Sequence, residues 1–249
     1  MKKVIFNADD FNLTYGVCKG IVKTNQFGVV QSTSVMVNLP GIEESLRLCN
    51  DSSLDLGLHI NLTFGKPVLP SEMVSSLVDE KGNFYRKHSL LKEKAKINEI
   101  KLEIEAQFEK ARKLNINISH LDSHHNIHLL KGIYDVYKEI AKSEKLPLRS
   151  NTPEMTAEFK DQGLITPDNF IDTFYYQNVR LDYLMELTRN MPEGITEIMC
   201  HPGYIDSGLM SISHYNLLRK KEFDILTNPE LKTHFESLEI AVIGYTDLK

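Results

Sequence analysis

The sequence has few cysteines, and their arrangement excludes two common architectures. Cys18, Cys49 and Cys200 are an odd number at wide spacings, so a framework of disulfides is not expected. The chain has no CxxC pair, the usual sign of zinc bound by thiolates. Neither a disulfide-stabilised domain nor a cysteine-based zinc fold therefore fits this sequence.

Long apolar runs and an excess of basic residues are also lacking. No apolar run approaches the roughly 20 residues of a membrane-spanning helix, and the one in the opening MKKVIFNADDF is too short for a signal peptide. The formal net charge is −5, and no basic patch points to nucleic acid. We expect a cytoplasmic protein that binds neither nucleic acid nor membranes, and a homodimer would agree with the base rate for enzymes of this size.

The length and the alternation of segment types predict an α/β fold. A chain of 249 residues, 41% of them hydrophobic, fits one domain over residues 1–249, the usual size of a (β/α) barrel. Buried strands are expected at 3–8, 32–38, 54–64, 117–123, 194–200 and 239–245. Helical patterns occupy 16–28, 40–50, 90–114, 132–145, 213–222 and 229–236. We expect a distorted barrel of parallel strands with outer helices, and an open doubly wound sheet is the alternative.

Two stretches and two missing motifs complete this outline. Residues 65–88 resemble a long loop, and a loop of that length is often functional. Residues 151–180 favour no element. Neither GxGxxG nor GxxxxGK[ST] occurs, so the sequence does not support a loop that binds nucleotide phosphates.

Histidines cluster in residues 119–128, SHLDSHHNIH, which hold four of the nine in the chain. Neither a protein surface nor a core favours such a cluster, so we interpret it as a site. In a strand, His120, Asp122 and His124 would share one face, because side chains alternate. If a helix instead begins after Ser123, His124 and His128 would lie one turn apart on a common face.

Other polar residues follow the ends of other predicted strands, in NADD, GLHINLT and CHPGY. The carboxyl ends of parallel strands in α/β folds meet at one mouth, where ligands bind. Taken singly, an Asp could cap a helix, His59 could be a core histidine and His201 could belong to a turn. Taken together, the strand ends are expected to bring five side chains into one site: Asp9, Asp10, His59, His124 and His201.

Such a set has the chemistry of a catalytic metal site. Imidazole with carboxylate suits zinc, and additional carboxylates and waters admit magnesium or manganese. Asp10 with two histidines would leave positions open for water and substrate. Asp9 could be the general base on the metal-bound water, and His201 could protonate the leaving group or stabilise the tetrahedral intermediate.

Neighbouring residues have supporting interpretations. Asp122 or His120 could orient a metal ligand by a hydrogen bond. Cys200 precedes His201 on a strand, where adjacent side chains point to opposite faces, so we expect it to be buried packing and not a nucleophile. The whole arrangement favours a hydrolase of an amide or an ester.

NADDF, GLHINLT, HLDSHHNIH and CHPGY, in this order and at these spacings, resemble the YdjC/ChbG family of carbohydrate deacetylases. The resemblance spans residues 7–204. It implies a barrel-like α/β fold related to polysaccharide deacetylases, and removal of an acetyl group from N-acetylated sugars such as chitin disaccharide. It also implies one divalent metal ion, Mg²⁺ or Zn²⁺. Asn12 follows NADDF where the family often has Gly, a small change beside the metal.

Residue by residue, the resemblance implies Asp9 as base and His201 as acid or oxyanion partner. It implies metal ligands at Asp10, His59 and His124. An alternative ligand set follows the Asp and HxxxH pair of more distant polysaccharide deacetylases: Asp10, His124 and His128, with His59 lining the sugar pocket.

The substrate and the class of activity leave further alternatives. Phe64 and Tyr204 could stack on sugar rings or simply pack in the protein. A metal-dependent phosphoesterase on an α/β scaffold and a non-catalytic protein that binds metal or sugar are the rival functions.

Overall fold

A sheet of seven parallel strands forms the centre of the computed structural model, which describes residues 1–248. The strand order is β4-β3-β2-β1-β6-β5, with β7 beside the first half of β1. The strands are β1 (Lys2–Phe11), β2 (Ser32–Val35), β3 (Asp55–Ile60), β4 (Ile118–Ser123), β5 (Asn169–Ile171), β6 (Gly194–Cys200) and β7 (Ala241–Ile243). Because all pairs are parallel, the carboxyl ends of these strands lie on one side of the sheet.

The sheet curls, and an irregular segment links its two edges. Next to β4, Leu121 donates its backbone N–H to Pro147 (2.9 Å) and accepts one from Arg149 (3.0 Å). Leu148 in turn donates to the carbonyl of Ile165 (2.9 Å), and the chain then runs into β5. The predicted distorted barrel is therefore confirmed, with single backbone hydrogen bonds in place of a full strand at the gap.

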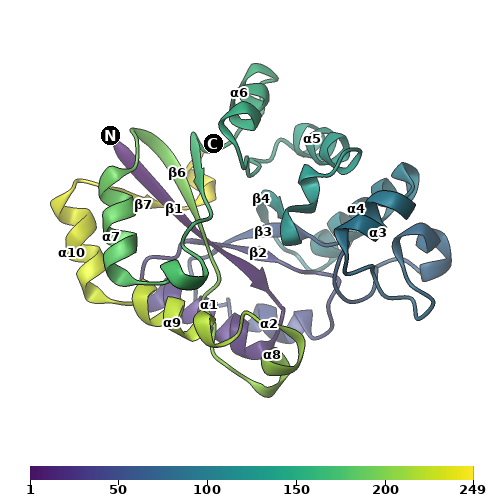
Figure 1. Ribbon diagram of the computed structural model, residues 1–249, viewed down its shortest axis with the longest axis horizontal. Helices are drawn as coiled ribbons and strands as arrows, with labels where there is room; N and C mark the ends of the chain where they lie inside the picture. The colour runs from purple at the N-terminus through teal and green to yellow at the C-terminus, as the bar shows by residue number, and fades with distance from the viewer. Residues whose placement is uncertain (249) are drawn as a thin grey trace.

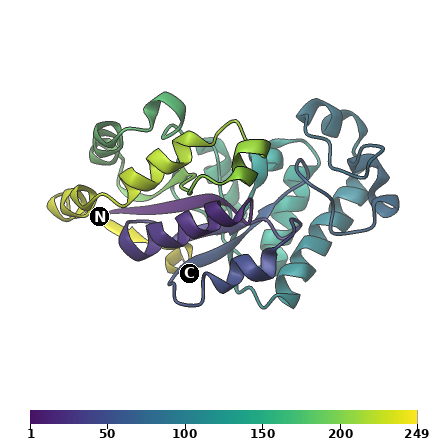
Figure 2. The same cartoon turned by 90° about the horizontal axis from the view of Figure 1, so that it is seen from below.

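Helices surround the curled sheet on its outer side (Figures 1 and 2). They are α1 (Tyr15–Phe27), α2 (Ile42–Arg47), α3 (His88–Lys94), α4 (Ile97–Lys113), α5 (Ile133–Glu144), α6 (Pro153–Asp161), α7 (Leu181–Asn190), α8 (Ser207–Ile212), α9 (Leu217–Leu226) and α10 (Pro229–Ser237). Short 3₁₀ turns are η1 (Ser71–Leu77), η2 (His124–Leu129), η3 (Tyr176–Asn178) and η4 (Tyr245–Leu248). Among residues 1–248, no helix combines the length and the apolar character needed to cross a membrane.

Local chemistry explains several helix starts. Thr14 caps α1 by accepting from the backbone N–H of Val17, and Asp206 caps α8 through Leu209. Helices α6 and α10 begin with Pro153 and Pro229, which lack an N–H that the first turn would leave unpaired anyway.

The structure corrects the predicted elements in three places. The expected helix 90–114 is two helices, because the backbone is extended at Ala95 and Lys96, where the N–H of Lys96 binds Ser76 Oγ (2.9 Å). The expected loop 65–88 contains η1 and the start of α3. Residues 151–180, for which no element was predicted, contain α6, β5 and η3, and α7 follows them.

Candidate active site

A cavity of about 640 Å³ lies at the carboxyl ends of the strands. The structure brings to it all five residues that the strand ends were expected to supply: Asp9, Asp10, His59, His124 and His201. Phe64 lines the same cavity. Tyr204 does not line it, and its ring instead packs on Phe223 with centroids 4.8 Å apart.

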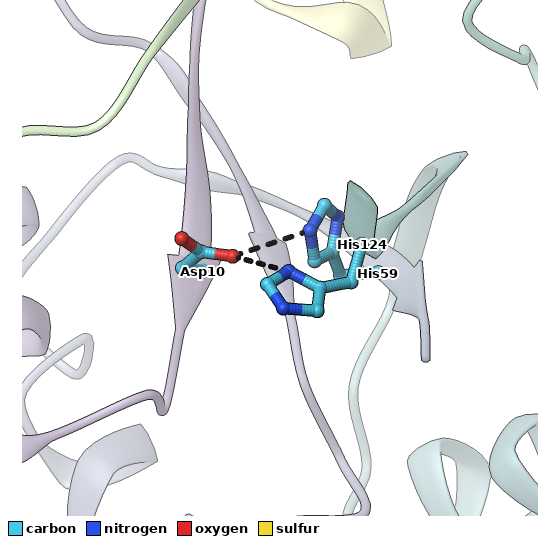
Figure 3. Close-up of side chains that lie close together, drawn as sticks. All are labelled: Asp10, His59 and His124. Carbon is cyan, nitrogen blue, oxygen red and sulfur yellow. Dashed lines mark ion pairs between the residues drawn. The ribbon is translucent and has the colours of Figure 1, made fainter. Parts of the chain in front are cut away.

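Asp10, His59 and His124, which line this cavity, point toward one another (Figure 3). Asp10 Oδ1 lies 2.9 Å from His124 Nδ1 and 3.4 Å from His59 Nε2. Ligand atoms of the three buried side chains lie within 4.8 Å of one another. One carboxylate oxygen and two imidazole nitrogens in this arrangement could hold a metal ion and leave positions open on the cavity side.

A break in the regular pairing of β1 explains how two adjacent aspartates both reach the cavity. Adjacent strand residues point to opposite faces, yet the register of β1 against β2 shifts between Ala8 and Phe11. Asp10 has a φ of +70°, in the left-handed region that non-glycine residues seldom adopt. Irregularities of this kind re-aim a side chain, and here the result places Asp10 beside Asp9 in one site.

Asp122 fixes the orientation of His59 from behind. Its Oδ1 lies 2.7 Å from His59 Nδ1, so the ring donates there and points Nε2 toward Asp10. Burial alone would lower the pKa of His59, but Asp122 and Asp10 outweigh it and raise that pKa to about 10. The predicted supporting role of Asp122 thus agrees with its position.

Arg219 of α9 holds the other oxygen of Asp10. Its guanidinium contacts Asp10 Oδ2 at 2.5 Å, and its Nε donates to the carbonyl of Tyr215 at 3.0 Å. Burial alone would raise the pKa of Asp10, but the charges of Arg219 and His124 hold it well below its usual value. Asp10 therefore stays ionised and presents a single oxygen, Oδ1, to the two histidines.

Arg149 holds Asp9 in a forked ion pair. Its Nη1 and Nη2 donate to the two oxygens of Asp9 at 2.8 and 2.7 Å. The same guanidinium contacts Asp122 (3.1 Å) and Glu197 (2.7 Å), so one fully buried arginine joins three carboxylates. Oδ1 of Asp9 also accepts from the amide of Asn7 (2.9 Å), whereas Oδ2 accepts only from Arg149 in the part of the chain that the structure describes and keeps a lone pair; Asp9 lines the cavity.

His201 lines the cavity directly after the end of β6. The rings of Tyr175 and Tyr215 pack on it with centroids 5.2 and 5.6 Å away. Burial lowers the pKa of His201 to about 4, so its imidazole is neutral near pH 7. Within residues 1–248 its Nδ1 has no hydrogen-bond partner.

His120 and His128 do not line the cavity. His128 is fully buried, with Nδ1 2.6 Å from Ser123 Oγ and Nε2 2.6 Å from Asn151 Oδ1. Both ring nitrogens of His128 are hydrogen-bonded, so His128 has no free nitrogen to offer a metal in the alternative ligand set. The reason is local: His125 and Asn126 adopt left-handed φ values of +57° and +52°, which break the helical face expected for His124 and His128.

Several residues in or near the cavity could not be identified as site residues from the sequence. Arg149 and Arg219 carry no motif, and Arg219 is one of three consecutive basic residues in α9. The pair Tyr175 and Tyr176 was visible in FYYQN but lay in a stretch without a predicted element. Arg86, from the excursion between β3 and α4, stands 5.1 Å over the ring of Phe64.

Comparisons with known proteins cover the whole chain. Residues 3–237 match the family described as YdjC-like protein. A carbohydrate deacetylase of Thermoanaerobacter pseudethanolicus is 42% identical, and one of Clostridium beijerinckii is 35% identical; the alignments cover 100% and 99% of this chain and 100% of each relative.

Solved structures agree with this similarity. The crystal structure of a proposed cellobiose-phosphate cleavage protein from Enterococcus faecalis is 36% identical and superposes with a TM-score of 0.93, covering 99% of this chain and 98% of that one. An uncharacterised protein of Agrobacterium tumefaciens, 7% identical with a TM-score of 0.57, shares the fold over 100% of this chain and 89% of its own.

Proposed function

The chain belongs to the YdjC-like family, and we propose that it is a metal-dependent carbohydrate deacetylase that removes acetyl groups from N-acetylated sugars. The observation that carries the proposal is the convergence of Asp10, His59 and His124 beside Asp9 in one cavity. The names of the full-length relatives support the same reaction.

The donor set fits one divalent metal ion on Asp10, His59 and His124. Two imidazoles and one carboxylate are typical of catalytic zinc, whereas magnesium prefers oxygen ligands and water, so we propose Zn²⁺ ahead of Mg²⁺. An ion held there supplies Lewis acidity, which polarises an amide carbonyl and makes a water molecule more acidic. A second candidate group, Asp9, His59 and Asp122, shares His59, and both of its carboxylates are already paired with Arg149, which supports a single ion.

Asp9 is the proposed general base. It borders the cavity beside Asp10, and the fork of Arg149 fixes its plane. Asp9 takes a proton from the attacking water as the new C–O bond forms. It then returns that proton to the amide nitrogen as the C–N bond breaks, and acetate and the sugar amine leave.

His201 is the proposed partner of the oxyanion. With its pKa near 4, it is neutral at pH 7 and can donate an N–H hydrogen bond to the developing negative charge. Of the two roles that the resemblance implies, this one suits a neutral imidazole better than that of a proton donor to the amine.

A small N-acetylated oligosaccharide is the proposed substrate, with N,N′-diacetylchitobiose as the first to test. A volume of about 640 Å³ is in the range of pockets that enclose small ligands. Phe64 and Tyr176 present aromatic rings at this cavity, and flat rings of this kind pack well on the apolar faces of sugars.

Acetate release by the metal-stripped protein, before and after the return of Zn²⁺ or Mg²⁺, tests the proposal. We expect release only with metal, and we expect Asp9→Asn to lower kcat by about 10²- to 10⁴-fold while one metal ion still binds. Asp224→Asn, an exposed aspartate paired with Lys220 on α9, is the control and should keep full activity. An Asp9→Asn variant with normal turnover would exclude Asp9 as the base. A protein that binds metal and sugar without turnover would support the non-catalytic alternative.

A further inference from the structure

The last turn of the chain inserts a tyrosine under the active site. Tyr245 follows β7 and is fully buried, although it lies four residues from the end of the sequence. Its backbone N–H donates to Ser32 Oγ (3.0 Å) at the start of β2, and its ring stacks on His120 of β4 with centroids 3.8 Å apart and planes at 7°. Tyr245 is thus held through its backbone by β2 and through its ring by β4.

The neighbours of Tyr245 tie the same turn to β3. Thr246 donates its backbone N–H and its hydroxyl to the carboxylate of Asp55, each at 2.9 Å. Gly244 passes so close to this carboxylate that an added Cβ would lie 2.1 Å from Asp55 Oδ2. The absence of a side chain at residue 244 therefore allows the turn to dock.

A continuous chain of hydrogen bonds leads from Tyr245 to the proposed base. The hydroxyl of Tyr245 donates to Glu197 Oε2 at 2.6 Å. The other oxygen of Glu197 accepts from Arg149 Nε at 2.9 Å, and the same guanidinium forks onto Asp9. Glu197 is held from both sides, by Tyr245 and by Arg149.

We infer from this geometry that Tyr245 is a positioning residue, which acts through Glu197 and Arg149 to hold Asp9 at the cavity. The inference rests on the proposed role of Asp9 and adds to it a requirement for the C-terminal turn. Among residues 1–248, the side chain that hydrogen-bonds to Asp9 besides Arg149 is Asn7, whose amide donates to Oδ1 at 2.9 Å. The orientation of the Asp9 carboxylate therefore depends chiefly on the position of the Arg149 guanidinium.

The metal ligands are less exposed to a change at Tyr245. Asp122, which orients His59, keeps a hydrogen bond from Ser34 Oγ (2.5 Å) in addition to its contacts with His59 and Arg149. If the phenol oxygen is removed, Glu197 loses the partner of one buried oxygen and can turn, and the guanidinium turns with it. The loss should appear in turnover and not in metal affinity.

Tyr245→Phe removes one oxygen and keeps the ring on His120, and Tyr137→Phe is its matched control. Tyr137 is equally buried, but its hydroxyl bonds to backbone carbonyls, those of Leu121 (2.7 Å) and Arg149 (3.2 Å). We expect Tyr245→Phe to lower kcat about tenfold at unchanged KM and unchanged Zn²⁺ affinity, since misplacing a catalytic group by about 1 Å can cost as much as 10²-fold. Tyr137→Phe should retain the kcat of the unmodified protein, even if it lowers Tm as much as Tyr245→Phe does.

A second variant keeps the inference testable if Tyr245→Phe folds poorly. Glu197→Gln retains a hydrogen-bonding side chain of the same shape but removes the charge that holds Arg149 Nε, and it should lower kcat at least as far as Tyr245→Phe. Equal kcat values for Tyr245→Phe, Tyr137→Phe and the unmodified protein would overturn the inference, as would full turnover of folded Glu197→Gln. If Asp9→Asn is inactive while both variants turn over normally, only the role of Tyr245 fails; if Asp9→Asn is active, the proposed base fails as well.

Discussion

Replacing Asp122 by Asn should weaken metal binding without removing a metal ligand. Asp122 Oδ1 accepts from His59 Nδ1 (2.7 Å), and its Oδ2 accepts from Ser34 Oγ (2.5 Å) and contacts Arg149 (3.1 Å). An asparagine has the same shape, but it presents an oxygen to only one of these two sides. The two amide orientations therefore fail in different ways.

Each orientation has a defined cost. If the amide NH₂ faces His59, the ring must accept at Nδ1 and carry its proton on Nε2, the nitrogen that faces Asp10. If the NH₂ instead faces Ser34 and Arg149, the residue loses the hydrogen bond from Ser34 and the contact with Arg149 that hold Asp122 Oδ2 in place. Loss of such a carboxylate behind a histidine ligand typically weakens metal binding by about 10- to 100-fold, or about 1.4 to 2.8 kcal/mol.

Calorimetric titration of the metal-stripped protein with Zn²⁺ measures this change directly. The control is Glu103→Gln, because Glu103 is an equally buried carboxylate that binds the backbone N–H groups of Val68 and Leu69 and, among residues 1–248, is hydrogen-bonded to no histidine. We expect the control to keep the affinity of the unmodified protein. A folded Asp122→Asn protein that binds Zn²⁺ as tightly as the control would refute the reasoning that Asp122 holds His59 ready for a metal.

Three other changes have distinct expected outcomes. His128→Gln should leave Zn²⁺ affinity unchanged but cost about 1–3 kcal/mol of unfolding free energy through the buried bonds to Ser123 and Asn151; a lost metal site would instead favour the ligand set with His128. Phe64→Ala should raise KM for the disaccharide roughly three- to tenfold at constant metal affinity, and an unchanged KM would show that no sugar ring packs there. Burial raises the pKa of Glu222 to about 7, so Glu222 is protonated in the folded protein below about pH 7. The stability that this raised pKa contributes is complete below the unfolded pKa and is lost as pH rises through 7. Between pH 4.5 and 8 this loss is about 3 kcal/mol, measurable by urea unfolding as a pH dependence that Glu222→Gln lacks, and equal pH dependence in both proteins would contradict it.

The strands that carry the site could be predicted because they are long buried runs. β1, β3 and β6 contain apolar stretches, β4 has Ile118 and Leu121 among polar residues, and the polar residues at or just after the ends of the four are Asp10, His59, His124 and His201. β5 has three partly buried residues and leaves no pattern to detect, whereas the equally short β7 lies within the predicted strand 239–245. The break between α3 and α4 depends on a contact with Ser76, a tertiary interaction that helical periodicity does not contain.

The arginines of the site could not be predicted for a related reason. Arg149 and Arg219 act by reaching carboxylates 140 and 209 residues away in sequence, and no spacing encodes such a pairing. The alternative role for His128 was reasonable at helical spacing, but the left-handed residues His125 and Asn126 turn its ring toward Asn151. The position of Tyr204 on Phe223 is likewise set by how α9 packs, and not by its proximity to His201 in sequence.

The most direct test of the account is acetate release from N,N′-diacetylchitobiose while Zn²⁺ is titrated into the metal-stripped protein. If one ion on Asp10, His59 and His124 supports the reaction, the rate should rise in proportion to added metal and stop rising at one equivalent per chain. Release that is the same with and without metal, or a rate that keeps rising well beyond one equivalent, would contradict the account.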